Sequence, residues 1–177
     1  MRRGAAFWLT GLPGSGKTTL ALSAVKRFPS FVRLSMDEMR RIVTPAPTYS
    51  EQERDLVYRS LVYAALVLTR EGKDVVIDAT ANLLVWRELA RSLIPNFHEI
   101  YVQCPLELCR KREGARADTS APKGIYKKAE SGWPVPGVNV PYEEPERPEL
   151  VVDTGVQCLD DAEDAVIRYI EKTLKAS

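Results

Sequence analysis

An eight-residue stretch near the N-terminus, GLPGSGKT at residues 11–18, has the spacing G-x-x-x-x-G-K-[ST]. It follows an apolar run and opens a helical pattern, which is the context of a phosphate-binding loop. Glycines let the backbone turn its N–H groups inward around an anion, and the start of the next helix adds a positive field. We therefore predict a nucleoside triphosphate site. Its predicted residues are Gly11, Leu12, Pro13, Gly14, Ser15, Gly16, Lys17, Thr18 and Thr19.

Three oxygen-bearing side chains could complete this site with Mg²⁺. The Thr18 hydroxyl is the expected ligand from the loop, and Lys17 brings its charge to the β- and γ-phosphates. Asp78 ends the apolar run VVID, and Asp37 follows the run FVRLS, so both lie where parallel strands bind ligands. Asp37 could also orient or deprotonate an attacking hydroxyl, although an aspartate there could simply be a helix N-cap. The predicted catalytic residues are Lys17 and Asp37, and the predicted metal ligands are Thr18, Asp37 and Asp78.

The use of the triphosphate follows from what surrounds the loop. GTPases read their base with N-K-x-D, which none of Asn82, Asn96 and Asn139 begins. Large ATPase motors carry a second acidic residue after the strand aspartate, but Asp78 is followed by Ala79. A small phosphotransferase fits best, because it binds its acceptor as a second molecule and shields it from water.

Two arginines and one long loop are candidates for holding that acceptor. Arg40 lies one helical turn beyond Asp37, and Arg54 lies in a helical pattern, where a solvated surface residue is the plainer interpretation. Residues 122–150 are rich in proline and fit neither a helix nor a strand. Structureless loops of this length are uncommon inside compact domains and are usually disordered or functional. We interpret residues 114–145 as a mobile lid over the acceptor.

The composition of the chain limits the remaining possibilities. Its 177 residues predict a single domain, 1–177, and a net charge of +1 gives no general surface for nucleic acid or membranes. No apolar run reaches the length of a membrane span. Cys104, Cys109 and Cys158 have no metal-ligand spacing, which favours buried residues in a reducing cytoplasm. The single histidine, His98, is interpreted as solvated or structural.

Apolar runs alternate with helical patterns along the whole chain. This alternation predicts a three-layer α/β fold with a mainly parallel five-stranded sheet. Ser50 and Glu53 have the spacing of a capping box at a helix start. The predicted strands are 5–11, 31–35, 74–80, 97–104 and 149–154, and the predicted helices are 16–28, 50–71, 83–94, 105–113 and 160–175.

Several segments together resemble the adenylylsulfate kinase family. They are FWLTGLPGSGKTT (7–19), EIYVQCPLELCRKR (99–112), and KGIYKKA (123–129) followed by PYEEPERPELVVDT (141–154). The resemblance implies a P-loop kinase fold, the lid, and transfer of the γ-phosphate of ATP to the 3′-hydroxyl of adenosine 5′-phosphosulfate (APS) in sulfate activation. It also implies that Arg112 binds ATP, and it leaves a homodimer as one possible assembly. The implied acceptor-binding residues are Asp37, Arg40, Tyr49, Arg54, Asn82, Lys123, Gly124, Ile125 and Trp133.

Some positions depart from the family pattern and keep other acceptors open. The family asparagine after its arginine motif is Val57, and the phenylalanine that stacks on the acceptor adenine is Val135, for which we expect Trp133 to substitute. Some members carry a phosphorylatable serine where this chain has Asn82. An insertion at 114–121 is expected to bring Arg116 close to the phosphates. The alternatives are a kinase for another small hydroxyl acceptor, a polynucleotide 5′-kinase, or a non-catalytic nucleotide-binding module.

Overall fold

The protein, a computed structural model that describes residues 2–115 and 123–176, is built on one all-parallel sheet. The spatial order of the strands is β2-β3-β1-β4-β5, so the first strand lies at the centre. All five predicted strands are confirmed, and the sheet is wholly parallel rather than mainly so. The strands are β1 (Ala6–Thr10), β2 (Val32–Ser35), β3 (Val75–Asp78), β4 (Phe97–Gln103) and β5 (Leu150–Asp153).

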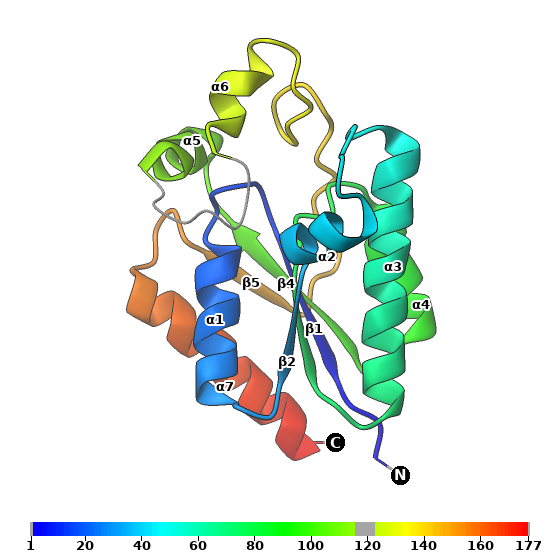
Figure 1. Cartoon of the computed structure of the whole chain (residues 1–177). Helices are drawn as coiled ribbons and strands as arrows, with labels where there is room; N and C mark the ends of the chain where they lie inside the picture. The colour runs from blue at the N-terminus through cyan, green and yellow to red at the C-terminus, as the bar shows by residue number, and fades with distance from the viewer. Residues whose placement is uncertain (1, 116–122, 177) are drawn as a thin grey trace.

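Helices cover both faces of this sheet. Figure 1 shows α1 and α7 on one side of the strands and α3 and α4 on the other. All five predicted helices are confirmed, and two further ones, α2 and α6, are found among the described residues. None of these helices combines the length and apolar character needed to cross a bilayer. The helices are α1 (Lys17–Arg27), α2 (Met36–Val43), α3 (Glu51–Arg70), α4 (Leu84–Leu93), α5 (Leu106–Ala115), α6 (Ile125–Ala129) and α7 (Leu159–Ala176).

The central strand supplies side chains to two separate cores. Ala6 and Trp8 pack under α3 and α4, whereas Phe7 and Leu9 pack under α1 and α7. Successive side chains of a strand point to opposite faces, so a strand covered on both sides must be apolar throughout. Every residue of β1 and of β3 is buried. Most polar groups of β1 and β3 therefore lie where these strands end, as Thr10 and Asp78 do.

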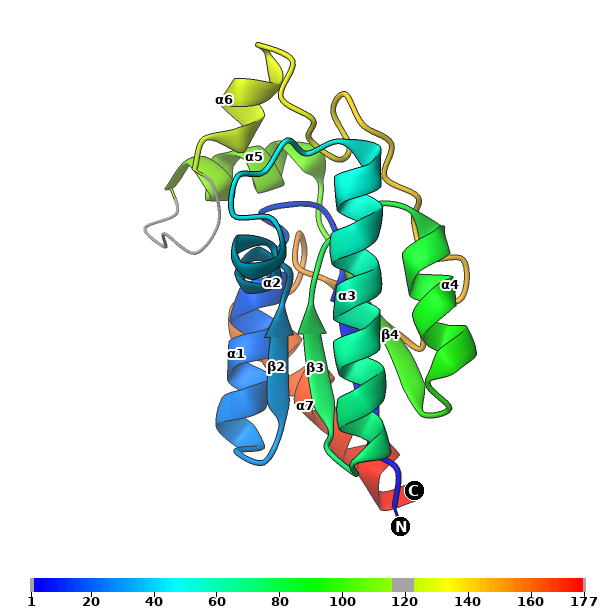
Figure 2. The same ribbon diagram turned by 45° about the vertical axis from the view of Figure 1, so that its right-hand side comes forward.

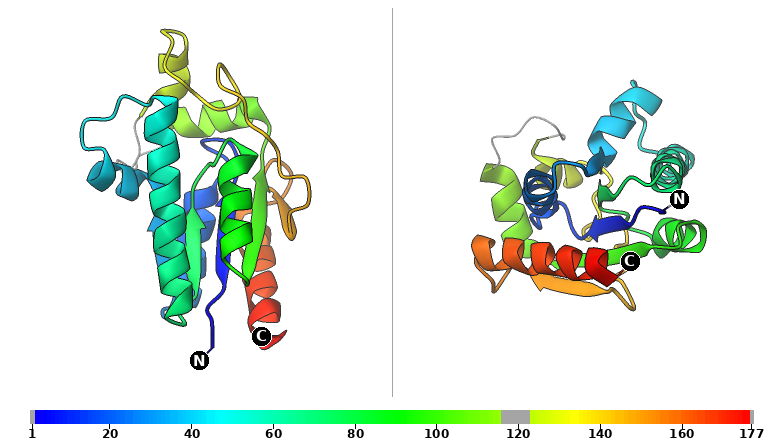
Figure 3. Two further views of the ribbon diagram at one scale, coloured as in Figure 1. Left: turned by 90° about the vertical axis from the view of Figure 1, so that its right-hand side faces the viewer. Right: turned by 90° about the horizontal axis from the view of Figure 1, so that it is seen from below.

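The carboxyl ends of the strands all lie at one end of the molecule. Figures 2 and 3 show α2, α5 and α6 gathered at this end, while both chain termini lie at the opposite end. A third, smaller core forms here between α5, α6 and the following loop, from Cys104, Cys109, Tyr126 and Val135. Apolar contacts therefore hold the described part of the predicted lid against α5 and the carboxyl end of β4. Arg116 and most of the predicted 114–121 insertion lie outside the described residues.

Four local predictions need correction. Asp37 is not a helix N-cap, because Ser35 has that role and its hydroxyl accepts a hydrogen bond from the Glu38 amide at 3.4 Å. The predicted segment without secondary structure contains helix α6, which starts at a left-handed Gly124. Cys158 is exposed rather than buried. Only half of the predicted capping box forms.

That half consists of the Ser50 hydroxyl, which accepts from the Glu53 amide at 3.3 Å. The Glu53 carboxylate binds the Thr48 and Tyr49 amides and Arg40 instead of reaching back to Ser50. His98 is structural, as one of the two interpretations expected. Its Nδ1 lies 2.7 Å from the Tyr169 hydroxyl, and its ring stacks on Phe7.

A cluster of charged residues joins the start of β5 to the neighbouring strand β4 and to helix α4. The Glu149 carboxylate accepts hydrogen bonds from Arg91 and from the Glu99 amide, the latter at 2.7 Å. Burial alone would raise the pKa of Glu149, but these hydrogen bonds outweigh it and lower the pKa below its ordinary value. The folded state therefore favours the ionised carboxylate. The resulting stability is present above the ordinary pKa of a glutamate and is lost as the pH falls through the lowered value.

We predict that Glu149→Gln lowers the free energy of unfolding at pH 7 by about 0.5–1 kcal/mol, because the half-exposed ion pair is partly screened by solvent. Urea unfolding at pH 7 and below pH 4 measures the effect, and the difference from wild type should shrink at the lower pH. Glu88→Gln is the matched control, since Glu88 lies 3.7 Å from the same Arg91 but is mostly exposed. Equal losses in the two variants would contradict the prediction.

Candidate active site

The phosphate loop is shaped by its contact with α5 and by the start of α1. Gly14 has a φ of 85°, and a Cβ there would meet the backbone oxygen of Cys109 in α5 at 2.5 Å. Gly16, at φ 103°, is the N-cap of α1 and has no side chain to cap the first amides. The start of the helix is therefore open to an anion, as a phosphate site requires.

The cationic and acidic groups behind this loop are packed together. Lys17 is nearly buried, and its Nζ donates to the backbone oxygen of Leu12 at 2.8 Å. Asp78 is held by Arg33, whose Nη1 lies 3.2 Å from its carboxylate. Burial raises the pKa of Asp78, and the charges of Lys17 and Arg33 and a hydrogen bond from Thr18 oppose that rise. A buried carboxylate that needs positive charge thus lies beside the loop that binds phosphate.

Arg112 reaches the loop from α5. Its guanidinium donates to the Thr154 hydroxyl at 3.1 Å and to the Thr154 backbone oxygen at 2.8 Å. The Thr154 hydroxyl in turn donates to the backbone oxygen of Ser15 at 2.8 Å. The end of β5 therefore fixes both the phosphate loop and the predicted ATP-binding arginine.

The acceptor side is formed by α2, α3 and the lid. Arg40 pairs with Glu53 at 2.9 Å and lies 4.9 Å from the ring centre of Tyr49. Arg54 donates to the backbone oxygen of Pro134 at 3.0 Å, so it joins α3 to the lid. The rings of Tyr49 and Trp133 are in contact, with their centres 4.5 Å apart. Arg54 is thus not the solvated surface residue of the plainer interpretation.

These two sides enclose one cavity of about 510 Å³, a size suited to small molecules. Gly11, Leu12, Ser15, Lys123 and Gly124 do not line it. The Gly124 amide instead donates to Glu113 at 2.7 Å. The predicted residues that line the cavity are Pro13, Gly14, Gly16, Lys17, Thr18, Thr19, Asp37, Arg40, Tyr49, Arg54, Asp78, Asn82, Arg112, Ile125 and Trp133.

Other lining residues were missed by sequence reasoning. Tyr58 follows Arg54 by four residues in α3, a spacing that brings side chains to the same face of a helix and could have indicated it. Burial raises the pKa of the Tyr58 hydroxyl, which accepts a hydrogen bond from the Ala81 amide at 2.8 Å. Nothing in the sequence pattern indicated the rest. The missed lining residues include Met36, Tyr58, Thr80, Glu113, Pro134 and Pro136.

The phosphate loop follows the central strand of a parallel sheet, and arginines line the other half of the cavity that it borders. This combination defines a P-loop phosphotransferase. The family model described as adenylylsulphate kinase matches residues 3–153. A probable adenylyl-sulfate kinase from Archaeoglobus fulgidus is 40% identical over 153 residues, which cover 83% of this chain and 94% of the relative. An adenylyl-sulfate kinase from Bacillus licheniformis is 33% identical over 177 residues, covering 95% and 85%.

The solved structures agree with these relatives. The structure of a Mycobacterium tuberculosis APS kinase in complex with AMPPNP and APS superposes with a TM-score of 0.83 at 29% identity, covering 97% of this chain and 99% of that one. The chain belongs to the adenylylsulphate kinase family, whose members are ATP-dependent kinases. The family resemblance read from the sequence is confirmed.

We predict that Lys17→Ala lowers the rate of phosphoryl transfer by about 100-fold or more, because one preorganised charge on the transferring group supplies a few kcal/mol. The melting temperature should change little, and a coupled assay of ADP release measures the rate. Lys26→Ala, an exposed lysine in the same helix, is the control. A near wild-type rate in Lys17→Ala would remove the loop from the reaction.

Proposed function

We propose that this protein transfers the γ-phosphoryl group of ATP to the 3′-hydroxyl of APS, giving 3′-phosphoadenosine 5′-phosphosulfate. One observation carries the proposal: the phosphate loop and the arginine- and aromatic-lined acceptor side form a single cavity. Enzymes of this class act chiefly by holding donor and acceptor in line and by stabilising charge in the transition state. The APS-bound relative supports adenylylsulfate as the acceptor.

On the donor side, the loop amides and Lys17 hold the triphosphate, and Arg112 contacts it from α5. The donor set fits Mg²⁺, since Thr18, Asp37 and Asp78 offer oxygen ligands to a hard cation that keeps several waters and shares phosphate oxygens. When bound, the ion neutralises charge on the β- and γ-phosphates. Among the described residues, no group of three or more acidic, histidine or cysteine side chains could hold a metal without the nucleotide.

On the acceptor side, we assign Asp37 to the attacking hydroxyl. It lies in the first turn of α2, at the carboxyl end of β2, and lines the cavity together with Lys17. A carboxylate there can orient the hydroxyl and take up its proton. Arg40 and Arg54 are proposed to hold the phosphosulfate, for which a planar guanidinium is well suited. Each would exchange a present partner, Glu53 or the Pro134 carbonyl, for the anion.

Two positions where this chain departs from the family pattern, Val57 and Val135, favour a different acceptor, but only one of them lies at the cavity. Val57 is fully buried between α3 and the sheet and does not line the cavity, so the family asparagine is replaced at a core position. Val135 is also buried, but it does line the cavity. The second candidate, a kinase for another small hydroxyl acceptor, therefore rests on Val135 alone. A homodimer and a cytoplasmic location remain predictions, and the free thiols of Cys104 and Cys109 support a reducing compartment.

The proposal is tested by incubating the protein with ATP, Mg²⁺ and APS and following ADP release together with the phosphorylated product. We expect APS to be preferred over a panel of nucleosides, sugars and oligonucleotides, because its anionic end meets both arginines. Removal of Mg²⁺ with a chelator should abolish turnover, and its return should restore it. Preference for an acceptor without the phosphosulfate would favour the second candidate.

We predict that Trp133→Ala weakens APS binding by about 1 kcal/mol, or about fivefold, through loss of an aromatic surface for the adenine. The affinity for an ATP analogue should remain within about twofold in the same titration, since the ring lies on the acceptor side. Tyr63→Ala, which removes an exposed ring from the outer face of α3, is the control. Normal APS affinity in Trp133→Ala would mean that the base stacks elsewhere.

A further inference from the structure

A short segment near the end of the predicted lid 114–145 is tied to the body of the protein, although Pro141 and Glu143 are exposed and Tyr142 is half-buried. We call Pro141–Glu143 the strap. The Asn82 side chain donates to the Pro141 carbonyl at 2.9 Å, and the Glu143 amide donates to the Asn82 carbonyl at 2.7 Å. The Glu143 carboxylate accepts from the Leu84 amide at 2.6 Å, which caps the start of α4. The strap is thus bound to the loop between β3 and α4.

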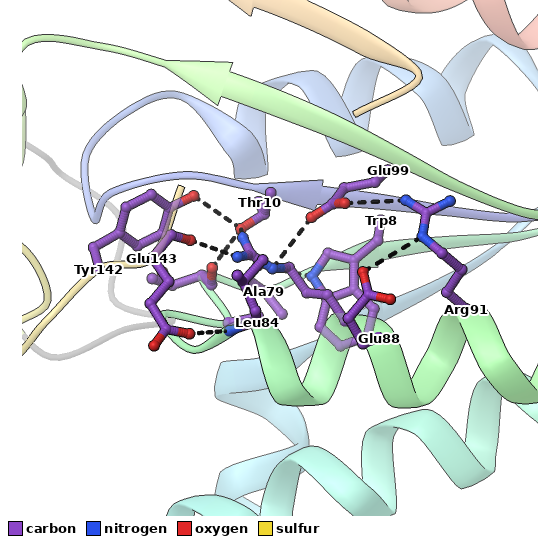
Figure 4. A network of polar contacts seen from close by, with 12 residues as sticks. Trp8, Thr10, Ala79, Leu84, Glu88, Arg91, Glu99, Tyr142 and Glu143 are labelled. Atoms are coloured by element: carbon purple, nitrogen blue, oxygen red, sulfur yellow. Dashed lines mark hydrogen bonds and ion pairs between the residues drawn. The ribbon is translucent and has the colours of Figure 1, made fainter. Parts of the chain in front are cut away.

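A buried arginine joins the strap to the sheet. Arg87 in α4 has no exposed surface. Its guanidinium donates to the Thr10 hydroxyl at 3.1 Å and to the Glu143 carbonyl, and it lies 5.8 Å from the ring centre of Tyr142. Its Nε lies 3.2 Å from Glu99 of β4, but neither atom makes an aligned hydrogen bond, so charge holds this pair. Figure 4 shows how Thr10, Tyr142, Glu143 and Glu99 converge at this point.

The Thr10 hydroxyl is the centre of this network. It donates its one hydrogen to the Thr80 carbonyl at 2.6 Å, so it must accept the hydrogen bonds from Arg87 and from the Tyr142 hydroxyl at 3.0 Å. Thr10 ends β1 and directly precedes Gly11 of the phosphate loop, while Thr80 lines the cavity. One hydroxyl group therefore links the donor side, the acceptor side and the strap.

The loop Ala79–Asn82, between β3 and α4, lines the cavity and contains the predicted acceptor-binding residue Asn82. This whole acceptor-side loop is held in the same way. The Trp8 indole donates to the Ala79 carbonyl at 3.0 Å, and the Ala81 amide donates to Tyr58. Ala81 has a φ of 43°, a left-handed conformation that a residue with a Cβ adopts at some cost. Each of the four residues of this loop is thus hydrogen-bonded to a side chain or amide from another element. Such a loop presents one geometry to the cavity.

Stability alone does not account for this arrangement. Taking an ion pair and several hydroxyl groups out of water costs free energy, and apolar residues would often stabilise the fold as well. What a buried network of ion pairs and hydrogen bonds supplies is a single arrangement of the elements that it joins. In-line phosphoryl transfer needs that, since a displacement of about 1 Å can cost about 100-fold in rate.

We propose that Arg87 and Tyr142 are positioning residues that hold the acceptor side of the site, and the root of the lid, in register with the phosphate loop. Neither side chain lines the cavity. Within the predicted lid 114–145, the strap is then a fixed segment. This inference rests on the proposed function, because it concerns the alignment of donor and acceptor.

Tyr142→Phe tests the inference with little loss of packing. We expect kcat for APS phosphorylation to fall about tenfold, because the acceptor side is no longer fixed to within a fraction of an ångström. The fraction of ATP that is hydrolysed by water without phosphorylating the acceptor should rise, because the site closes less tightly. The KM for ATP should stay within about twofold, since the phosphate loop keeps its own contacts.

Two controls separate positioning from simple stability. Tyr169 also has a partly buried hydroxyl in a hydrogen bond, with His98, but it lies far from the site. Tyr169→Phe should therefore leave kcat and coupling unchanged. Thr10→Ser keeps the central hydroxyl and should behave like wild type, whereas Thr10→Val should resemble Tyr142→Phe. Because both changes break one network, the double variant should lose less than the sum of the two.

A Tyr142→Phe enzyme with wild-type kcat and coupling, and only a lower melting temperature, would overturn the inference. If the wild type ignores APS, the proposed function fails, and the inference is then decided by amide hydrogen exchange. Faster exchange at Ala81 and Glu143 in Tyr142→Phe, with unchanged affinity for an ATP analogue, would support it. Unchanged exchange at both amides would overturn it.

Discussion

The complete burial of β1 and β3 between two helical layers is the constraint on which the rest of the structure depends. Their backbone groups are paired with parallel neighbours on both sides, and Asp78 at the end of β3 is their one charged side chain. Polar chemistry is therefore displaced to the carboxyl end of the sheet. There the first strand meets the phosphate loop, Asp78 ends the adjacent strand β3, and Asp37 follows β2, one strand further out.

The same constraint explains why the buried charges nearest the sheet are paired. Arg87 and Glu99 are almost wholly buried, yet they lie together and are shared among α4, β4 and the strap. Asp78 is balanced by Arg33 and Lys17. A buried charge of this kind is expensive to leave alone, so each pair also fixes the distance between the elements that carry it. Chemistry at the sheet edge and order within the sheet are thus linked.

The sequence predicted the parts of this protein whose signal is local. The phosphate loop, the alternation of apolar runs with helical patterns, and Arg40 at one helical turn from Asp37 are all patterns within a few residues. Helix α2 was missed because eight residues with four charges next to a strand end resemble a loop. The strap was seen only as a family motif, since its contacts with Thr10 and Arg87 join residues more than 50 positions apart. No periodicity reports such pairings.

The distribution of tryptophan gives the molecule an optical property that follows from its architecture. Of the three tryptophans, Trp8 and Trp86 are buried in the core between the sheet and the helices α3 and α4. Trp133 lies at the cavity, against Tyr49 and 5.4 Å from the Lys128 ammonium group. Its emission depends on the polarity and charge beside the ring, which an entering nucleotide alters. The protein therefore carries its own fluorescent reporter of acceptor binding, in addition to the emission of the two buried tryptophans.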